Sequence, residues 1–279
     1  MNYMSPFFSI VMANYNSGHY IERAIQSVLS QSCKDFELIV VDGGSSDESV
    51  DIIKKYTDKL SWWVSEPDKG QSDAFNKGFS HATGRYYTWL NADDLLLPNV
   101  LEKVKAFIEK KKYQPWIAIN TCYIDKDDRV IQCSVCPDFS NKVLKHGTVS
   151  DIGPSSFFSA ELFSKYGPFD IDNHYTMDCD LWMKFVNGGH RYYRVPGWGW
   201  AFRVHELSKT SGGITGKPSE KHIASRRKIR NQNNFTERWI NRYYQKAMKL
   251  IKCSYQRFRM NKKYVGLNIK ELNNMRDFE

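Results

Sequence analysis

The pattern of apolar and polar positions divides the first hundred residues into alternating strands and helices. Four short runs rich in apolar, aromatic and β-branched residues predict buried strands, at residues 7–13, 36–41, 61–65 and 86–90. Ser45 and Glu48 have the spacing of a capping box, which predicts that a helix starts at this point. Strands that alternate with helices at this pitch predict an α/β fold with a doubly wound, mostly parallel sheet.

The second half of the chain is less regular. Residues 116–124 and 130–135 predict a hairpin. Residues 191–195 and 200–204 predict two further strands, and the second of them leads directly to His205.

Charge is distributed unevenly, and this marks a boundary. The chain carries a net charge of +9, but residues 217–279 alone hold 17 basic and 5 acidic residues, a net of +12. Residues 1–216 are therefore mildly acidic, with a net charge of −3. Glycines at 212, 213 and 216 also signal the end of a globular unit. We expect one α/β domain over residues 1–216 and a basic helical tail over residues 217–279.

The tail contains an amphipathic pattern. Residues 219–260 hold apolar and aromatic residues among many Lys and Arg residues. From Phe235 onward the apolar positions recur at spacings of three and four, which predicts a helix with an apolar stripe and a basic face. Such a helix can bind an anionic membrane surface. It can also pack on the α/β domain, or on a second copy of the chain as a homodimer. A nucleic-acid-binding role for the tail is a further alternative, although nucleic acid is not the expected partner.

Composition excludes several other classes of protein. The hydrophobic content of 41% is a globular value, and no apolar run approaches the roughly 20 residues of a membrane span. Residues 1–9 lack the basic and apolar segments of a signal peptide, which predicts a cytoplasmic protein, either free or peripheral on the inner face of the cell membrane. Of the six cysteines, only Cys133 and Cys136 have a metal-like spacing, so reduced thiols are expected.

Polar residues follow the predicted strands. They are Asn14, Asn16, Asp42, Asp68, Asp93 and Asp94. The carboxyl ends of parallel strands meet at one edge of a sheet, where open α/β sheets bind their ligands. The adjacent carboxylates of Asp93 and Asp94 are suited to a divalent cation. The alternative is that one of them caps the helix whose first turn contains Pro98.

Neither glycine-rich phosphate loop, GxGxxG or GxxxxGK[ST], occurs in the sequence. An α/β nucleotide site without such a loop must neutralise the phosphates by other means, and a metal ion held by strand-end carboxylates does so. Asp42 follows the second strand, at the depth where a base or ribose would lie. A carboxylate there can accept the N3–H of uracil.

Several motifs occur together and in order. They are Asn14-Tyr15-Asn16, Val41-Asp42-Gly43-Gly44, Glu66-Pro67-Asp68-Lys69-Gly70 with Asn76-Lys77-Gly78, Leu90-Asn91-Ala92-Asp93-Asp94, Asp178-Cys179-Asp180-Leu181-Trp182, and Phe202-Arg203-Val204-His205. In these motifs, residues 5–211 resemble the GT-A family 2 glycosyltransferases. The likeness is greatest to bacterial enzymes that build capsule, exopolysaccharide or lipopolysaccharide.

The resemblance implies an inverting, metal-dependent glycosyltransferase. Such an enzyme moves a sugar from a nucleotide-sugar, expected here to be UDP-linked, to a glycan or lipid-linked acceptor in surface polysaccharide biosynthesis. Mn2+ or Mg2+ is the implied cofactor. Direct displacement at the anomeric carbon needs a base on the acceptor side and a cation on the leaving diphosphate, but no covalent nucleophile.

The resemblance also implies roles for individual residues. Asp178 matches the catalytic base, Asp93 the metal ligand, and His205 a histidine that completes the metal or diphosphate site. Asn91 and Met177 replace acidic residues that the family usually has at these positions. The implied donor-binding residues are Asn14, Asn16, Asp42, Asp68, Asn76, Asn91 and Asp93.

Two alternative interpretations accompany these assignments. Asp180 lies on a different helical face from Asp178 and can pair with Lys184, which predicts a structural role. A sugar nucleotidyltransferase also uses strand-end aspartates on an α/β sheet. That class would be expected to have a glycine-rich loop with Arg or Lys after the first strand, where this chain has residues 14–18.

Overall fold

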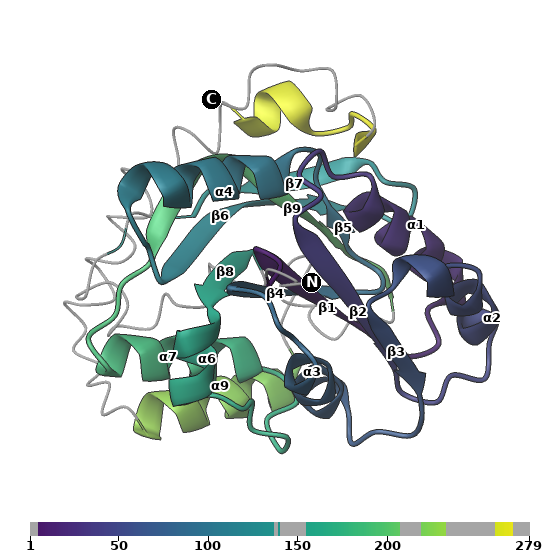
Figure 1. Ribbon diagram of the computed structural model, residues 1–279, viewed down its shortest axis with the longest axis horizontal. Helices are drawn as coiled ribbons and strands as arrows, with labels where there is room; N and C mark the ends of the chain where they lie inside the picture. The colour runs from purple at the N-terminus through teal and green to yellow at the C-terminus, as the bar shows by residue number, and fades with distance from the viewer. Residues whose placement is uncertain (1–4, 137–138, 140–154, 207–218, 233–259, 270–279) are drawn as a thin grey trace. The chain divides into compact units, whose positions relative to one another are not determined.

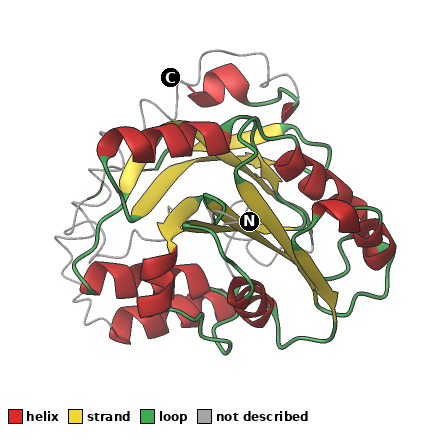
Figure 2. Cartoon of the chain, viewed as in Figure 1, coloured by secondary structure: helices red, strands yellow, loops and turns green. Residues whose placement is uncertain are grey.

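A computed structural model of the chain describes residues 5–136, 139, 155–206, 219–232 and 260–269 (Figure 1). The chain divides into two compact units. The first contains Met1–Ile117 and Ser156–His174, and the second contains Ala118–Ser155 and Tyr175–Glu279. Each unit combines strands with helices, as the colours of Figure 2 show, so the predicted α/β class is confirmed.

The first unit is built on a sheet of parallel strands. The strands of this sheet are β1 (Phe8–Asn14), β2 (Phe36–Asp42), β3 (Trp62–Ser65), β4 (Tyr86–Asn91) and β8 (Ser156–Ser159). The order is β3-β2-β1-β4-β8; the first four strands are parallel, and β8 runs antiparallel to β4. Nearly every position of β1 and β4 is buried, as expected for strands that are covered on both faces. The parallel pairing predicted for the first four strands is confirmed.

Helices of the first unit cover both faces of this sheet. These helices are α1 (Gly18–Leu29), α2 (Ser49–Lys54), α3 (Gln71–Ser80), α4 (Val100–Lys111) and α6 (Ala160–Tyr166). The unit also contains a 3-10 turn, η1 (Thr57–Lys59), and a short strand, β5 (Leu95–Leu96). Figure 1 shows α1 and α3 on opposite sides of the β1–β2 pair, which is the doubly wound arrangement. Helix α3 approaches the sheet closely at Gly78, where a Cβ atom would lie 2.2 Å from Val11 Cγ1.

The start of α2 differs from the prediction. The spacing of Ser45 and Glu48 predicted a helix from Ser45, but α2 begins at Ser49. The side chain of its N-cap residue, Glu48, makes no capping hydrogen bond, and Asp47 Oδ1 accepts from Ser49 N at 3.0 Å. The Ser45 hydroxyl instead donates to the carboxylate of Asp42. A serine hydroxyl can form a hydrogen bond either with a helix end or within a turn, and here Ser45 binds the charged carboxylate of Asp42.

The second unit contains the predicted hairpin. Its elements are β6 (Trp116–Ile124, whose first two residues belong to the first unit), β7 (Val130–Ser134), β9 (Tyr193–Arg203), α7 (Met177–Asn187) and α9 (Glu220–Gln232). Strand β7 pairs antiparallel with β6, and β9 lies beside β6 in the sheet order. The hairpin prediction is confirmed.

Strand β9 replaces the two strands that were predicted at residues 191–195 and 200–204. It is continuous from Tyr193 to Arg203. The indoles of Trp198 and Trp200 are buried, so the segment between the two predicted strands belongs to the sheet. Gly197 permits this continuity because it adopts a φ of 101°, which a residue with a Cβ atom rarely does.

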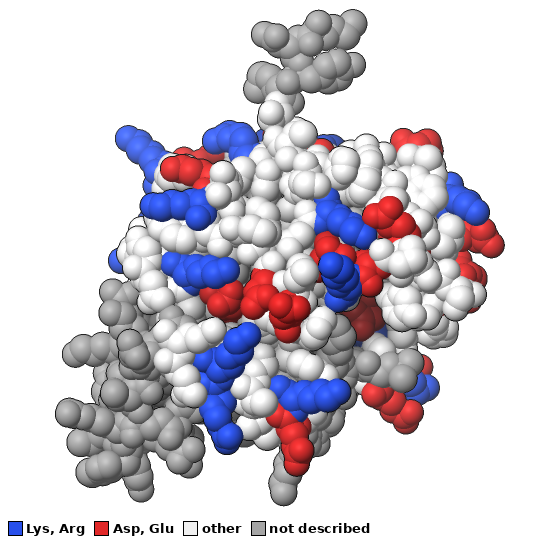
Figure 3. All heavy atoms as spheres, turned by 90° about the horizontal axis from the view of Figure 1, so that it is seen from below, with Lys and Arg blue, Asp and Glu red and all other residues white. Residues whose placement is uncertain are grey.

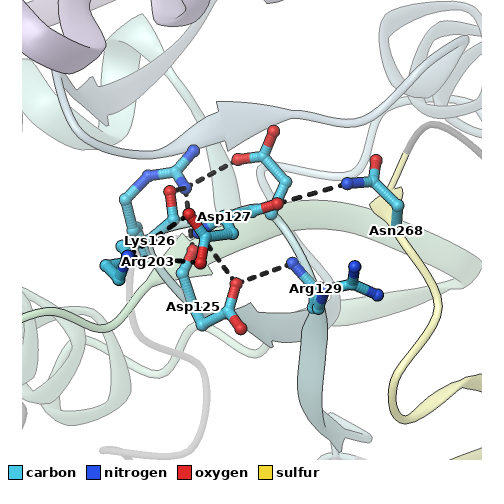
Figure 4. A network of polar contacts seen from close by, with 7 residues as sticks. Asp125, Lys126, Asp127, Arg129, Arg203 and Asn268 are labelled. Atoms are coloured by element: carbon cyan, nitrogen blue, oxygen red, sulfur yellow. Dashed lines mark hydrogen bonds and ion pairs between the residues drawn. The ribbon is translucent and has the colours of Figure 1, made fainter.

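The turn between β6 and β7 is held by a buried ion pair (Figure 4). Arg203 Nη1 lies 2.6 Å from Asp128 Oδ1, and both side chains are almost fully buried. The same nitrogen donates to the carbonyl oxygen of Asp125 at 2.8 Å. Asn268 Nδ2 donates to the carbonyl oxygen of Asp127 at 3.2 Å. The end of β9, the hairpin turn and a segment near the C-terminus are therefore joined in one network.

Described parts of the basic C-terminal segment belong to the second unit. Residues 260–269 lie along the hairpin, where Gly266 N donates to Val130 O at 2.8 Å. The predicted boundary after residue 216 does not coincide with a boundary between the two units and stays a prediction. Residues 233–259, which hold most of the predicted amphipathic helix, lie outside the described residues. Over the described ranges, no helix is long and apolar enough to cross a membrane.

Candidate active site

The tips of β1, β2 and β3 converge on the carboxylate of Asp42. The strand register places Asn14 beside Asp42, and Asp42 beside Ser65. Asp42 is fully buried. Its Oδ1 accepts from Asn14 Nδ2 at 2.6 Å and from the Ser45 hydroxyl, and its Oδ2 accepts from the Ser65 hydroxyl at 2.6 Å. The backbone N–H groups of Ser45 (2.9 Å) and Gly44 (3.2 Å) complete the set.

These hydrogen bonds keep Asp42 ionised. Burial by itself raises the pKa of this carboxyl, but hydrogen bonds from Ser45, Ser65 and Asn14 act in the opposite direction and together outweigh it, so the pKa is lowered. Five donors fill the acceptor capacity of one carboxylate. The strand tips of the first unit are therefore organised around a fixed negative charge.

The loop after β1 is built on the same network. Because the carboxylate of Asp42 can only accept, Nδ2 of Asn14 must face it, and this sets the orientation of the amide. Asn16 adopts a left-handed φ of 48°, which asparagine tolerates better than most residues. Its N–H donates to Ser45 Oγ at 2.8 Å, and its Oδ1 accepts from Ser46 N at 2.9 Å. The structure thus brings Asn14, Asn16 and Asp42 together.

Asp68 lies at the same edge of the sheet. A Cβ atom on Gly43 would lie only 2.6 Å from Asp68 Oδ2, so the carboxylate passes directly over the backbone at the tip of β2. Asp68 Oδ1 accepts from Gly70 N at 2.7 Å, which fixes the side chain. The adjacent Gly44 has a φ of 79°, a conformation that favours glycine. The absence of a side chain at Gly43 therefore lets the Asp68 carboxylate lie against the backbone next to Asp42.

The two carboxylates that follow β4, those of Asp93 and Asp94, lie in different environments. Asn91 Oδ1 accepts from Gln71 Nε2, and Asn91 Nδ2 donates to Asp94 Oδ2 at 2.8 Å. Asp94 is 1% exposed, whereas Asp93 is only partly buried. Asn91 therefore holds Asp94 inside the unit, and Asp93 is the carboxylate of this pair that keeps access to solvent.

Neither carboxylate caps the following helix. Helix α4 begins at Val100, its N-cap residue is Asn99, and β5 lies between Asp94 and this helix. The alternative interpretation of Asp93 and Asp94 as helix caps is therefore wrong.

Asn76 makes a structural contact. Its Nδ2 donates to the carbonyl oxygen of Phe169 at 2.9 Å, and its Oδ1 accepts from Phe169 N at 2.8 Å. Both polar atoms of the amide thus hold the backbone after α6 against α3. The prediction that Asn76 binds the donor gains no support from this geometry.

Asp178 lies in the first turn of α7, in the second unit. Burial raises the pKa of its carboxyl; the Cys179 N–H, 2.7 Å away, and the positive charge of Arg226 act in the opposite direction without cancelling the effect. A raised pKa makes a carboxylate a stronger base. Asp180 instead pairs with Lys184 one turn later, at 3.0 Å, as predicted.

His205 also belongs to the second unit. It follows the end of β9 by two residues, and Val204 N donates to Ile124 O at 2.8 Å, so the strand pairing continues to the residue before it. The His205 side chain is partly exposed. The structure therefore confirms the prediction that His205 directly follows a strand.

A divalent cation fits the chemistry of Asp93. Mg2+ and similar hard cations are held by one or two carboxylates together with substrate phosphates and water, and a partly exposed strand-end carboxylate is such a ligand. Within the described part of the chain, no three His, Cys, Asp or Glu side chains come together as a metal-binding group.

Charges of both signs are intermixed on the surface. On the face drawn in Figure 3, acidic and basic side chains of the described residues lie next to one another. One pair in the first unit joins the half-buried Lys77 to the exposed Glu66, with Lys77 Nζ 2.9 Å from Glu66 Oε1. Surface pairs of this kind contribute only about 0–1 kcal/mol each, so the site is distinguished by its buried charges.

Comparison with protein families identifies the chain. Residues 9–167 match the family model described as glycosyl transferase family 2. The chain belongs to this family. Its first unit, in which the strand-tip carboxylates lie, supplies most of the matched region.

Curated relatives support the same assignment. The glycosyltransferase RP339 of Rickettsia prowazekii is 33% identical over 203 residues, which cover 69% of this chain and 62% of the relative. The glycosyltransferase MJ1057 of Methanocaldococcus jannaschii is 26% identical over 208 residues, covering 68% of this chain and 71% of the relative. The match to the rickettsial relative thus spans about three fifths of its length.

Solved structures show that the fold is GT-A. TarS of S. aureus, solved as residues 1–349 in complex with UDP, superposes with a TM-score of 0.60 at 19% identity, covering 83% of this chain and 71% of that one. The mannosyltransferase PcManGT of Pyrobaculum calidifontis, in complex with GDP-Man and Mn2+, gives a TM-score of 0.55 at 15% identity, covering 97% and 79%.

Several residues of the site were not singled out from the sequence. Ser65 and Gln71 bind Asp42 and Asn91, but each comes from an element whose position relative to its partner only the fold determines. Tyr15 is 65% exposed at the tip of β1, beside the Asp42 network. An exposed aromatic ring there can stack on a base. Its place between Asn14 and Asn16 was the available sequence signal.

Proposed function

We propose that this enzyme is an inverting, metal-dependent transferase that moves a sugar from a UDP-sugar to a glycan or lipid-linked acceptor in surface polysaccharide biosynthesis. Membership of glycosyl transferase family 2 gives the reaction class. The main structural support for a nucleotide-sugar donor is the row of polar residues at the strand tips, Asn14, Asp42 and Ser65, with Asp68 above it. TarS, one structural neighbour, was solved with UDP and with UDP-GlcNAc, which supports a UDP-linked donor.

The proposed reaction needs few groups. Asp178 accepts the proton of the acceptor hydroxyl, and its raised pKa suits this task. Asp93 would hold Mn2+ or Mg2+, and His205 would complete the metal or diphosphate site. When bound, the cation neutralises charge on the departing diphosphate. Mn2+ in the PcManGT complex supports a divalent metal. Attack by the acceptor oxygen forms the new glycosidic bond as the bond to the diphosphate breaks, which inverts the configuration.

A panel of nucleotide-sugars with Mn2+ or Mg2+, scored for released nucleoside diphosphate, tests the proposal. Asp93→Asn removes a charge but not the shape of the side chain, so we expect it to abolish most turnover while the fold is kept. Asp178→Asn should lower turnover about 10²–10⁴-fold with normal binding of the nucleoside diphosphate. Asp180→Asn is the matched control, because Asp180 already pairs with Lys184. Wild-type turnover of Asp93→Asn in Mn2+ would exclude the metal assignment.

Calorimetry tests the base preference. Asp42 and the strand tips around it should favour UDP over ADP and CDP. Both Asp42 oxygens already accept hydrogen bonds from the protein, so an N–H of the base must share one of them or displace a hydroxyl donor such as Ser45 or Ser65. Asp42→Asn should therefore reduce the preference. Equal affinity of the wild-type protein for all three nucleotides would contradict this part of the proposal.

Association of the basic segment with an anionic membrane surface also belongs to this proposal. The sequence of residues 219–260 motivates it, and each Lys or Arg near an anionic surface contributes about 1 kcal/mol. Co-sedimentation of the full chain with anionic and with neutral vesicles tests it. Equal sedimentation with both kinds of vesicle would leave homodimer formation or packing on the enzyme as the role of the segment, which light scattering distinguishes.

A further inference from the structure

Helix α9, from the basic C-terminal segment, packs on the start of the helix that carries Asp178. Thr176, the N-cap residue of α7, is buried, and its Oγ1 lies 2.6 Å from Ser225 Oγ of α9. One turn earlier on α9, the ring of His222 lies 6.2 Å from the ring of Tyr175. Two successive residues before α7 are therefore in contact with two successive turns of α9.

The contacts define one face of α9. His222, Ser225, Arg226 and Ile229 follow one another at spacings of three, one and three, which places them on the same side of a helix. Ile229 is only 6% exposed, as expected for the packed side. Arg226 and Arg227 are both exposed, but Arg227 lies about 100° further round the helix, outside this face.

We propose that α9 is a positioning element for the catalytic base, in which Ser225 holds the N-cap of α7 and Arg226 stabilises the ionised form of Asp178. This inference rests on the proposed role of Asp178 as the base. It makes the start of the basic segment a part of the transferase, whatever the rest of that segment binds.

The charges around Asp178 support this role. Burial alone favours the protonated carboxyl, and among the charged side chains that the structure describes, Arg226 is the one whose positive charge opposes that effect. On its own helix, Asp180 is neutralised by Lys184 at 3.0 Å. On α9, burial and then the charge of Arg226 lower the pKa of His222, so this ring is neutral at neutral pH. Family members with a Glu before the base have a second carboxylate there, whereas this chain has Met177.

The pH dependence of kcat/KM, measured on the full chain, tests the proposal. Without the charge of Arg226 the pKa of Asp178 rises further, so the base is protonated over a wider acidic range. Arg226→Gln should therefore move the acid limb of the profile to higher pH, with a loss of about threefold or more on that limb and a smaller loss at alkaline pH. Arg226→Lys should restore the wild-type profile, since it keeps the charge.

Matched variants separate this effect from a structural one. Arg227→Gln removes an equal charge from the same helix, at a position outside the face that contacts the start of α7, and should leave the profile unchanged. His222→Gln should keep the acid limb, which excludes titration of the imidazole as its cause. A loss in Arg226→Gln that is equal at every pH, or an unchanged profile, would overturn the proposal. Asp178→Asn at full activity would instead contradict the proposed function, so the two failures are distinguishable.

Discussion

Replacement of Asp42 by asparagine tests whether charge holds the strand tips together. The variant keeps the shape of the side chain but turns one oxygen into an NH2 donor. The backbone N–H groups of Gly44 and Ser45 cannot turn away, so the new amide must keep its oxygen on their side. Its NH2 then faces Asn14 Nδ2 and the Ser45 hydroxyl. The amide of Asn14 must flip, because two donors cannot face each other.

The expected cost follows from these contacts. Three hydrogen bonds to the retained oxygen lose their charge assistance, which is worth about 1 kcal/mol each. Part of this is returned, because a neutral amide costs less to bury than a carboxylate. We expect Asp42→Asn to lower the free energy of unfolding by about 2 kcal/mol. Asp42→Ala should cost about 4 kcal/mol, since it removes the acceptor of the buried Asn14 amide and of the half-buried Ser45 N–H, at about 1–3 kcal/mol each.

Urea unfolding followed by circular dichroism measures these differences at neutral pH. The control is Asp58→Asn, because Asp58 lies exposed in η1 and its replacement should change stability by no more than about 0.5 kcal/mol. The pKa of Asp42 is lowered from its usual value of 3.8, so its ionised form stabilises the fold above that pH and the benefit is lost as the pH falls through the folded-state pKa. The gap between wild type and Asp42→Asn should therefore narrow in acid. A gap below about 0.5 kcal/mol at neutral pH would refute the reasoning.

Three further predictions concern stability, and thermal or urea unfolding checks each of them. Asp128→Asn breaks the buried pair with Arg203 and should cost about 3–5 kcal/mol, whereas replacing both partners by apolar residues should cost much less. Gly78→Ala should cost about 1–3 kcal/mol, because the new methyl group collides with Val11; a neutral result would mean that α3 moves freely on the sheet. Ser159→Ala removes the side chain that accepts from Leu162 N at the start of α6 and should cost about 1 kcal/mol, with Ser159→Asp retaining most of the stability.

Local patterns predicted much of the fold. Buried strands and amphipathic helices have different periods, and turn residues separate them, so the alternation from β1 to β4 could be predicted from the sequence. The same logic failed where two signals competed. Ser45 matched a helix cap, but a buried carboxylate from a neighbouring strand attracts its hydroxyl, and the sequence does not show that the two meet. No strand was predicted over residues 196–199, because the burial of this segment depends on neighbours that are distant in the chain.

The types of polar residue that follow each strand are visible in the sequence, and parallel pairing was enough to predict that Asn14, Asp42 and Asp68 share one edge. What each of these side chains does at that edge depends on contacts that form only when the chain folds. The tertiary structure saturates Asp42 with five donors, commits Asn76 to the Phe169 backbone, and separates the buried Asp94 from the more accessible Asp93. The physical reason is that hydrogen bonding and desolvation depend on the partners that folding brings within about 3 Å, and those partners come from elements far apart along the chain.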